Sequence, residues 1–241
     1  MLRNFILFIL ISSLTFAQSE SQVGWIAKFG AAGGFSPIII FPNYDGINPK
    51  LTEFGMKEFS GPIYAWGGSG YAYVMIIDNL RLGGIGFSGL QSEKNNLNNF
   101  ENEVVYSLGG GAATIEYTFP FVKNMALSAG IMIGGGSLEI DLYQNSGNFE
   151  WNSIWDSAVN SEEVNNKEIS MNNNFFLLSP TLNLDFPITR FLAIRGGLGY
   201  QFTFGSDWEI SNGKKLENVP SNLNGNGFFI QTGIFIGLFA F

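Results

Sequence analysis

Apolar and polar residues alternate at period two along most of this chain. In the segment 175–186 every even-numbered residue is apolar, whereas the polar residues Ser179, Thr181, Asn183 and Asp185 stand at odd positions. The segment 191–206 repeats this pattern. Period two indicates β-strands with two different faces. Runs of about ten or more residues exceed the strand of about five or six residues that is usual in soluble proteins.

The alternating runs predict an all-β fold of eight strands. We expect them at 22–35, 62–77, 80–90, 103–119, 124–142, 174–186, 191–206 and 227–241. The connections alternate in length. Those at 78–79, 120–123 and 187–190 are tight, and those at 36–61, 91–102, 143–173 and 207–226 are long and polar.

The turn chemistry supports this arrangement. Pro120 and Pro187 stand where two strands must reverse, and proline cannot donate a hydrogen bond to a strand ladder. An even number of long strands, with short turns at one end and long loops at the other, is typical of an antiparallel up-and-down transmembrane β-barrel. Both chain ends then lie at the short-turn end.

The first residues predict a secretory signal peptide over 1–17. Arg3 supplies a basic start, residues 5–14 are mostly apolar, and Ala17 ends a small-residue cleavage site. Residues 18–241 then form one barrel domain. An uncleaved anchor is the alternative, but the apolar stretch falls short of the about 20 residues that span a bilayer.

Glycines interrupt the alternation in four strands. In the segment 124–142 the apolar residues change from odd to even positions across Gly134–Gly136. A β-bulge adds one residue and reverses the faces of a strand, and glycine tolerates the backbone angles required. We therefore predict bulges or kinks at Gly68, Gly84, Gly110 and Gly135. The same interpretation turns Glu139 and Asp141 toward the barrel interior.

The eight-strand pattern resembles the small eight-stranded outer-membrane β-barrels, the class of the OmpA transmembrane domain and OmpX. The resemblance covers residues 18–241, and such barrels end in an aromatic strand, as this chain does at Phe239 and Phe241. The glycine that such barrels usually carry five residues before the last one is Ile236 here, and Gly237 follows it. The resemblance implies the outer membrane of a Gram-negative-type cell, with outer-membrane lipid as a partner.

Five charged residues have the parity of the barrel interior. Lys28, Arg81, Glu116, Asp185 and Arg195 all lie near the short-turn end of their strands. Because an ionised group in a narrow interior is costly unless it is paired, we predict an ion network that plugs the lumen. The alternative is that some of these groups are solvated at the rim.

Other motifs carry weaker signals. The glycine pattern of residues 84–89 lies inside a strand, which argues against nucleotide binding. Residues 43–48 offer oxygen ligands for Ca²⁺ but match an ordinary turn better. Glu162 and Glu163 are more typical of a solvated loop than of a glycosidase pair. No catalytic residue, cofactor or metal site is predicted.

Aromatic residues and one apolar loop segment leave alternatives open. Trp25 and Trp66 fit a membrane girdle. The remaining tryptophans, Trp151, Trp155 and Trp208, fall in expected loops, the first two around a short helix predicted over 152–167, and there they could contact sugar or protein. The apolar segment 37–42 could continue the first strand, form a flap over the barrel mouth or bind an apolar ligand. Proline at both of its ends favours the flap.

Composition narrows the function. The chain has no His and no Cys, which excludes imidazole or thiolate catalysts and metal sites. The formal charge of -8 argues against nucleic acid. We expect a non-enzymatic barrel with a structural or surface-contact role, which could meet protein or glycan through loops 36–61 and 143–173. The alternatives are a narrow channel or carrier of small apolar molecules and a secreted soluble barrel of lipocalin type.

Overall fold

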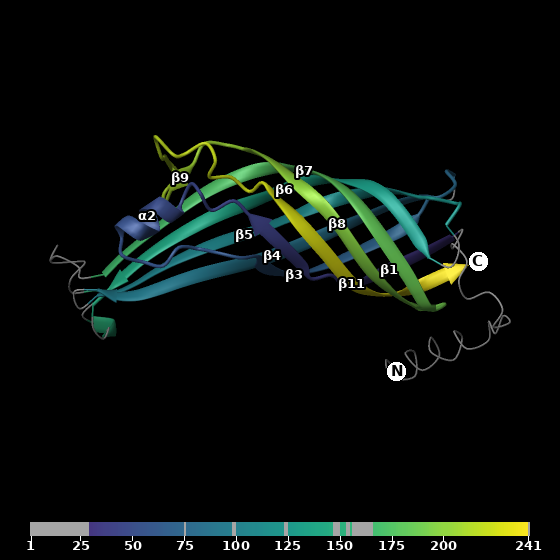
Figure 1. The fold of residues 1–241 in the computed structure, drawn as a ribbon, viewed down its shortest axis with the longest axis horizontal. Coiled ribbons are helices and arrows are strands. Elements are labelled where there is room, and N and C mark those ends of the chain that lie inside the picture. The colour runs from purple at the N-terminus through teal and green to yellow at the C-terminus, as the bar shows by residue number, and fades with distance from the viewer. Residues whose placement is uncertain are drawn as a thin grey trace.

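The computed structural model describes residues 29–74, 76–97, 100–122, 125–146, 150–152, 155 and 166–240. The expected signal peptide, Lys28, Trp25, Glu162, Glu163 and Phe241 lie outside this part. Strands dominate the fold (Figure 1). In the described residues no helix combines the length and the apolar character needed to cross a membrane.

The strands form a closed antiparallel ring of eight members, which confirms the predicted fold. The first member is one interrupted strand made of β1 and β2, which pairs with β3 on one side and with β11 on the other. From β3 each strand pairs with the next through β8, and β8 pairs with β11 to close the ring. The members are β1 (Phe29–Phe35), β2 (Ile38–Pro42), β3 (Ile63–Tyr73), β4 (Leu80–Leu97), β5 (Phe100–Thr118), β6 (Ala126–Asn145), β7 (Asn166–Thr189), β8 (Leu192–Gly205) and β11 (Gly227–Ala240).

The apolar segment 37–42 is a continuation of the first strand, so the predicted flap was wrong. Ile38 pairs with Ala65 of β3 and with Gln231 of β11, in the same register that β1 keeps with both neighbours. Pro37 interrupts the strand because it has no N–H to donate. Its carbonyl still accepts a bond of 3.0 Å from the Thr232 N–H.

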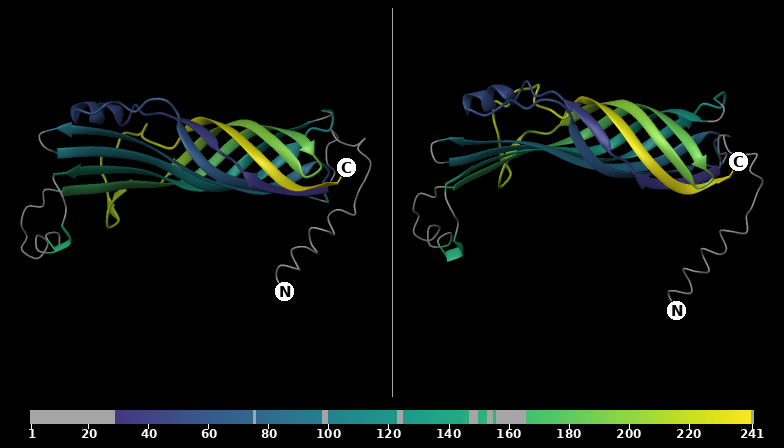
Figure 2. Two further views of the ribbon diagram at one scale, coloured as in Figure 1. Left: turned by 90° about the horizontal axis from the view of Figure 1, so that it is seen from below. Right: turned by 60° about the horizontal axis from the view of Figure 1, so that its bottom comes forward.

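The two ends of the barrel differ in length. Tight connections join β3 to β4, β5 to β6 and β7 to β8, and Phe29 pairs with Ala240 at this same end. At the opposite end β4 to β7 run far beyond the rest of the ring, as Figure 2 shows. Strand β7 alone has 24 residues. The expected loop 91–102 is therefore mostly strand, and the expected helix over 152–167 overlaps β7 at its last two residues.

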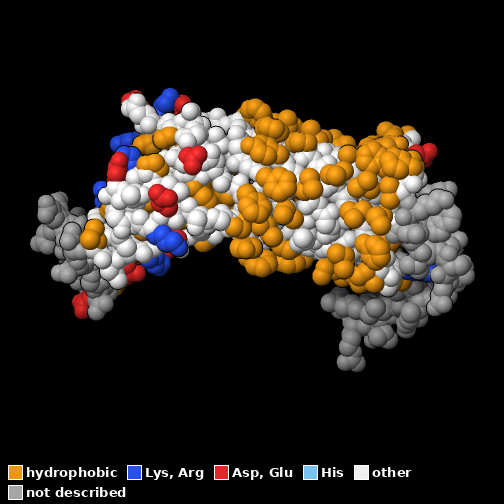
Figure 3. Space-filling view, in the orientation of Figure 1, with side chains coloured by type: hydrophobic (Ala, Val, Ile, Leu, Met, Phe, Trp, Pro, Cys, Tyr) orange, Lys and Arg blue, Asp and Glu red, His pale blue; other side chains and the backbone are white. Residues whose placement is uncertain are grey.

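An apolar belt surrounds the half of the barrel near the tight turns. Figure 3 shows this belt, whereas most charged side chains on the same face lie toward the other end. Within it, Leu82, Ile115, Leu184 and Ile194 are each at least 40% exposed. Side chains so exposed on a closed ring face lipid. The belt contradicts the soluble lipocalin alternative, and it places the protein in the outer membrane.

The predicted bulges at Gly68, Gly84, Gly110 and Gly135 are wrong. Each of these glycines keeps an unshifted register with the strands on both sides. Among the described strand pairs, the register irregularity that occurs lies between Pro187 and Thr189, beside a turn.

The shift of apolar residues from odd to even positions has a different cause. The solvent around the strands changes at the glycines. Below the glycines of β6, Ile133 faces lipid and Ser128 faces the interior. Above them, Leu138 and Ile140 are buried inside, and Glu139 and Asp141 lie on the outer face. The side-chain faces continue without reversal, while the apolar residues move from the outside to the inside. The strands thus leave lipid and enter water near the glycines. The sequence-based placement of Glu139 and Asp141 in the lumen was wrong.

The part of the sheet beyond the glycines, here termed the extracellular extension, comprises residues 89–97, 100–108, 137–145 and 166–175. Its inner face carries an apolar core, onto which segment 43–62, the capping loop, packs. Helix α2 (Asn48–Glu53) belongs to this loop, and Leu51 and Phe59 are each 2% exposed. The Asn48 side chain ties the loop together through bonds of 3.1 and 3.0 Å with the backbone of Phe59. Segment 206–226, with the small strands β9 (Glu209–Ile210) and β10 (Lys214–Lys215), covers another part of the core.

Candidate functional site

Four charged residues meet inside the membrane-embedded half of the barrel. Arg81 of β4 and Glu116 of β5 are direct cross-strand partners, as are Asp185 of β7 and Arg195 of β8. Their parity turns all four inward, so the two pairs face each other across the lumen. We call these four residues the ion cluster. Each is at most 4% exposed, so none is solvated at a rim.

Each arginine of the ion cluster contacts both carboxylates. Arg195 donates to Glu116 at 2.9 and 3.2 Å and to Asp185 at 2.6 and 2.9 Å. Arg81 lies 3.0 Å from a Glu116 oxygen and pairs with Asp185 as well. With two cations and two anions the cluster is electrically neutral. Lys28, the fifth residue of the predicted network, lies outside the described residues.

Neighbouring side chains complete the surroundings of the ion cluster. Asn183 donates to Glu116 at 3.1 Å, and Ser128 accepts from Arg81. The guanidinium carbons of Arg81 and Arg195 lie 4.6 and 4.8 Å from the ring centre of Tyr71. Cations attract aromatic faces more strongly where water is excluded. The cross-section of the lumen is therefore occupied by paired charge and rings.

A second obstruction lies above the ion cluster, where the apolar core fills the barrel mouth. Tyr106 is fully buried, and its ring centre lies 5.3 Å from that of Tyr44 and 6.0 Å from that of Phe59. The Tyr44 hydroxyl donates to Gln91 at 2.6 Å, and burial raises the pKa of Tyr44. Tyr44 and Phe59 belong to the capping loop, which is thereby fixed to the inner faces of β4 and β5.

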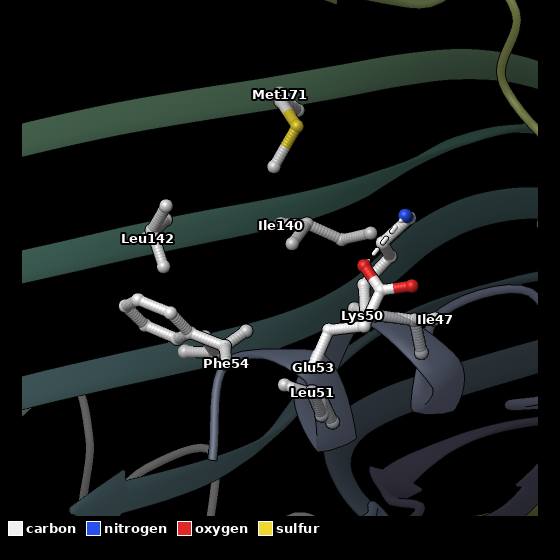
Figure 4. Close-up of a pocket in the computed structure, with 9 residues that line it drawn as sticks. Ile47, Lys50, Leu51, Glu53, Phe54, Ile140, Leu142 and Met171 are labelled. Atoms are coloured by element: carbon white, nitrogen blue, oxygen red, sulfur yellow. Dashed lines mark hydrogen bonds and ion pairs between the residues drawn. The ribbon is translucent and has the colours of Figure 1, made fainter. Parts of the chain in front are cut away.

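An apolar cavity of about 340 Å³ opens beside the capping loop (Figure 4). One wall comes from α2 and the residues directly before and after it, and the other from the inner faces of β5 to β7. Lys50 and Glu53 stand at its rim and form an ion pair of 2.8 Å. The lining residues are Ile47, Lys50, Leu51, Glu53, Phe54, Val104, Ile140, Leu142 and Met171. The sequence did not predict this cavity. The bulges expected at the glycines would have turned its strand residues, such as Ile140 and Leu142, toward the outside of the barrel, whereas they face inward.

The outer face of the extracellular extension is acidic. It carries five carboxylates on adjacent strands: Glu101, Glu103, Glu139, Asp141 and Glu168. One lysine, Lys94, pairs with Glu103 at 2.9 Å. Partial desolvation, with a further contribution from the carboxylates of Glu139 and Glu168, raises the pKa of Asp141. This face is suited to water and to cationic groups, in contrast to the belt below it.

The calcium-like segment and the glycine pattern, where the structure describes them, form an ordinary turn and part of a strand. Asn43 caps its own turn by accepting a bond of 2.7 Å from the Asp45 N–H. In the described residues no group of three or more acidic side chains converges as a metal site would require. The glycine pattern 84–89 lies within β4.

The tryptophans divide between membrane, core and surface. Trp66 is 64% exposed on the outer face of β3 and stacks on Phe35, as a girdle residue would. Trp208 is buried in the apolar core, which excludes the contact role that the sequence had left open for it. Trp151 and Trp155 are exposed and their rings touch edge to face, with centres 5.7 Å apart.

Comparisons with known proteins concern the fold. No protein-family model matches the sequence, and no curated protein does. Among solved structures the chain is similar to the outer membrane protein OprG from Pseudomonas aeruginosa, with 10% identity, coverage of 90% of this chain and 99% of that chain, and a TM-score of 0.48. It is similar to Ail, the attachment invasion locus protein of Yersinia pestis, in complex with the heparin analogue sucrose octasulfate, with 8% identity, 88% and 99% coverage and a TM-score of 0.46.

A major outer membrane protein from Thermus thermophilus is similar as well, with 9% identity, coverage of 87% of this chain and 99% of that chain, and a TM-score of 0.42. With identities this low, the assignment to the small eight-stranded outer-membrane barrels rests on the closed ring and its lipid-facing belt.

Proposed function

We propose that this protein is a closed, non-enzymatic outer-membrane barrel that holds a folded contact surface outside the cell. The observation that carries the proposal is the double obstruction of the lumen, by the buried ion cluster and by the apolar core above it. An eight-stranded barrel has an interior just wide enough for side chains to fill. Neither layer leaves a polar path for a hydrated solute.

The contact surface in this proposal is the outer face of the extracellular extension. Of the loop 36–61 expected to make contact, residues 38–42 are strand and the capping loop points its apolar side chains inward, which leaves polar residues such as Asp45, Lys57 and Glu58 exposed. The outer face, in contrast, presents Glu101, Asp141 and Glu168 to water. Its acidic character favours a partner with basic groups and disfavours sulfated glycans.

Planar-bilayer recording tests the closed lumen. The native protein is expected to give no steady ionic conductance. A variant lacking residues 43–62 should stay silent, because the ion cluster still fills the lumen below. Stepwise conductance from the folded native protein would overturn the proposal.

Binding arrays test the contact surface. The protein in lipid nanodiscs is applied to protein and glycan arrays at physiological salt, beside a variant with Glu101→Gln, Asp141→Asn and Glu168→Gln. Binding of basic partners by the native protein alone supports a surface-contact role. Equal binding by both proteins would show that the contact surface lies elsewhere than the acidic face, and no binding by either would assign the barrel a purely structural role.

A further inference from the structure

The structure assigns to the cavity between α2 and strands β5 to β7 the binding of a small, uncharged apolar molecule taken up from the water outside the cell. This inference goes beyond the proposed function, since a closed barrel with a contact surface needs no ligand. Four observations carry it: the lining of the cavity, its size, its position and its closed floor.

The lining is apolar except for one ion pair at the rim. Ile140 and Leu142 of β6 and Met171 of β7 face Leu51 and Phe54 across the cavity (Figure 4). Val104 of β5 also lines it. The two charged residues, Lys50 and Glu53, stand at the rim and neutralise each other at 2.8 Å. A charged ligand would find no unpaired counter-charge there. An uncharged hydrocarbon gains contacts and loses no hydrogen bonds.

The volume of about 340 Å³ is that of a small-molecule site. Ligand pockets span about 300–1,000 Å³. An apolar cavity of about 150 Å³ holds one benzene molecule, so this one has room for a two-ring hydrocarbon. Its walls are adaptable, because Met171 and Leu142 are only partly buried and methionine fills irregular spaces well.

The position of the cavity favours a ligand that arrives from water and not from the membrane. On the outer face of the same strands stand Glu139, Asp141 and Ser170, so water and not lipid surrounds the cavity walls. Ile140 lies four residues beyond Gly136, which is about 13 Å along the strand at about 3.3 Å per residue. A membrane acyl chain would have to leave the belt and cross this polar surface.

The floor of the cavity is closed. Beneath it Tyr106, Leu108 and Leu138 have no exposed surface, and the ion cluster blocks the lumen further down. A molecule that enters therefore stays at the extracellular end. This arrangement suits a receptor that retains its ligand and not a route across the membrane.

Methyl NMR tests the inference with naphthalene as the probe. The protein is labelled with ¹³C-methyl methionine, placed in nanodiscs of deuterated lipid and titrated with naphthalene. The Met171 methyl signal is expected to shift in a saturable way and to show contacts to naphthalene protons. Met132, which is 2% exposed within the barrel, serves as the internal reference and should not move.

Variants of one strand give matched controls. Leu142→Trp fills the cavity and Leu142→Asp places a charge in its wall, and each should weaken naphthalene binding roughly tenfold or more. Tyr143→Asp, on the opposite face of β6, should bind as the native protein does. Heat-modifiable gel mobility confirms that each barrel is folded, and Leu142→Trp keeps the test decisive if Leu142→Asp fails to fold.

Four results would overturn the inference. They are an unmoved Met171 signal at the solubility limit of naphthalene, equal shifts of Met171 and Met132, native affinity in Leu142→Trp, and contacts of Met171 with lipid chains in a second sample made with protonated lipid and no naphthalene. The last result would identify a membrane lipid as the occupant.

Discussion

At the scale of single residues, the ion cluster is stabilised by charge pairing, because each arginine contacts both carboxylates. Arg81 has no exposed surface, and its guanidinium lies between the carboxylates of Glu116 and Asp185 and the ring of Tyr71. Desolvation of four charges is expensive, and the attraction between them offsets that cost only while every member is present. The cluster should therefore respond to the loss of one partner far more than an exposed ion pair does.

Replacement of Arg81 by methionine leaves two buried carboxylates with one arginine. We expect Arg81→Met to lower the free energy of unfolding by about 3–5 kcal/mol, measured by urea unfolding in lipid vesicles. Lys50→Met breaks the exposed Lys50–Glu53 pair and should cost at most about 1 kcal/mol. The added change Asp185→Asn should recover part of the loss from Arg81→Met. Equal midpoints for the two single variants would contradict this account.

At the scale of an element, adjacent glycines of β4 have different roles. Gly83 faces the interior, where a methyl group would overlap the carbonyl oxygen of Gly70 on β3. Gly84 faces outward, and the nearest atom to a methyl group there is the Ala112 oxygen at 3.6 Å. Inward glycines thus permit the close approach of neighbouring strands in a narrow ring, whereas outward ones leave the outer surface smooth.

This difference predicts opposite outcomes for two neighbouring substitutions. Gly83→Ala should destabilise the barrel strongly, because the overlap is with backbone that cannot move without opening the β3–β4 pair. Gly84→Ala should be neutral or stabilising by about 0.4–1 kcal/mol, since alanine restricts the unfolded chain. Urea midpoints and heat-modifiable mobility measure both. If Gly84→Ala were as destabilising as Gly83→Ala, the conclusion that Gly84 has no special backbone role would be wrong.

The elements also show what the sequence could reveal. The ring order follows from the period-two alternation, and Pro120 stands at a turn as predicted. Pro187 does not, because it lies within β7 and pairs with Ala193, and the chain reverses only after Thr189. The inward parity of Arg81 and Arg195 follows from their lipid-facing neighbours. The extracellular extension could not be predicted in this way. Its strands alternate too, but with the apolar face inward. An alternating pattern is the same whether lipid or water surrounds the strand. The cavity depends on contacts between α2 and Met171, which no local pattern encodes.

At the scale of the whole molecule, each long strand crosses from one solvent to another. Ile115 and Val105 both lie on the outer face of β5, ten residues apart, which is about 33 Å at about 3.3 Å per residue. Ile115 is 41% exposed within the belt, and Val105 pairs with Asp141 on the extracellular extension. On the outer face of one strand, a charged substitution is therefore costly at the lipid-facing position and tolerated at the water-facing one.

Arginine placed at these two positions should locate the membrane boundary. Ile115→Arg is expected to cost about 2–4 kcal/mol, as cations do on the lipid face near the midplane. Val105→Arg should cost little, because its side chain stands in water beside carboxylates. Unfolding in vesicles of defined thickness compares the two. Similar losses at both positions would place Val105 in lipid as well.

The capping loop has a consequence for the order of assembly. Its apolar side chains dock onto the inner faces of β4 to β6, yet the tips of those strands carry carboxylates that must first pass the hydrocarbon layer. The loop comes early in the chain, but its docking site is complete only after later strands have crossed. Closure of the extracellular end is therefore expected as the final event of folding, and burial of Tyr44 and Phe59 would mark a barrel whose insertion is finished.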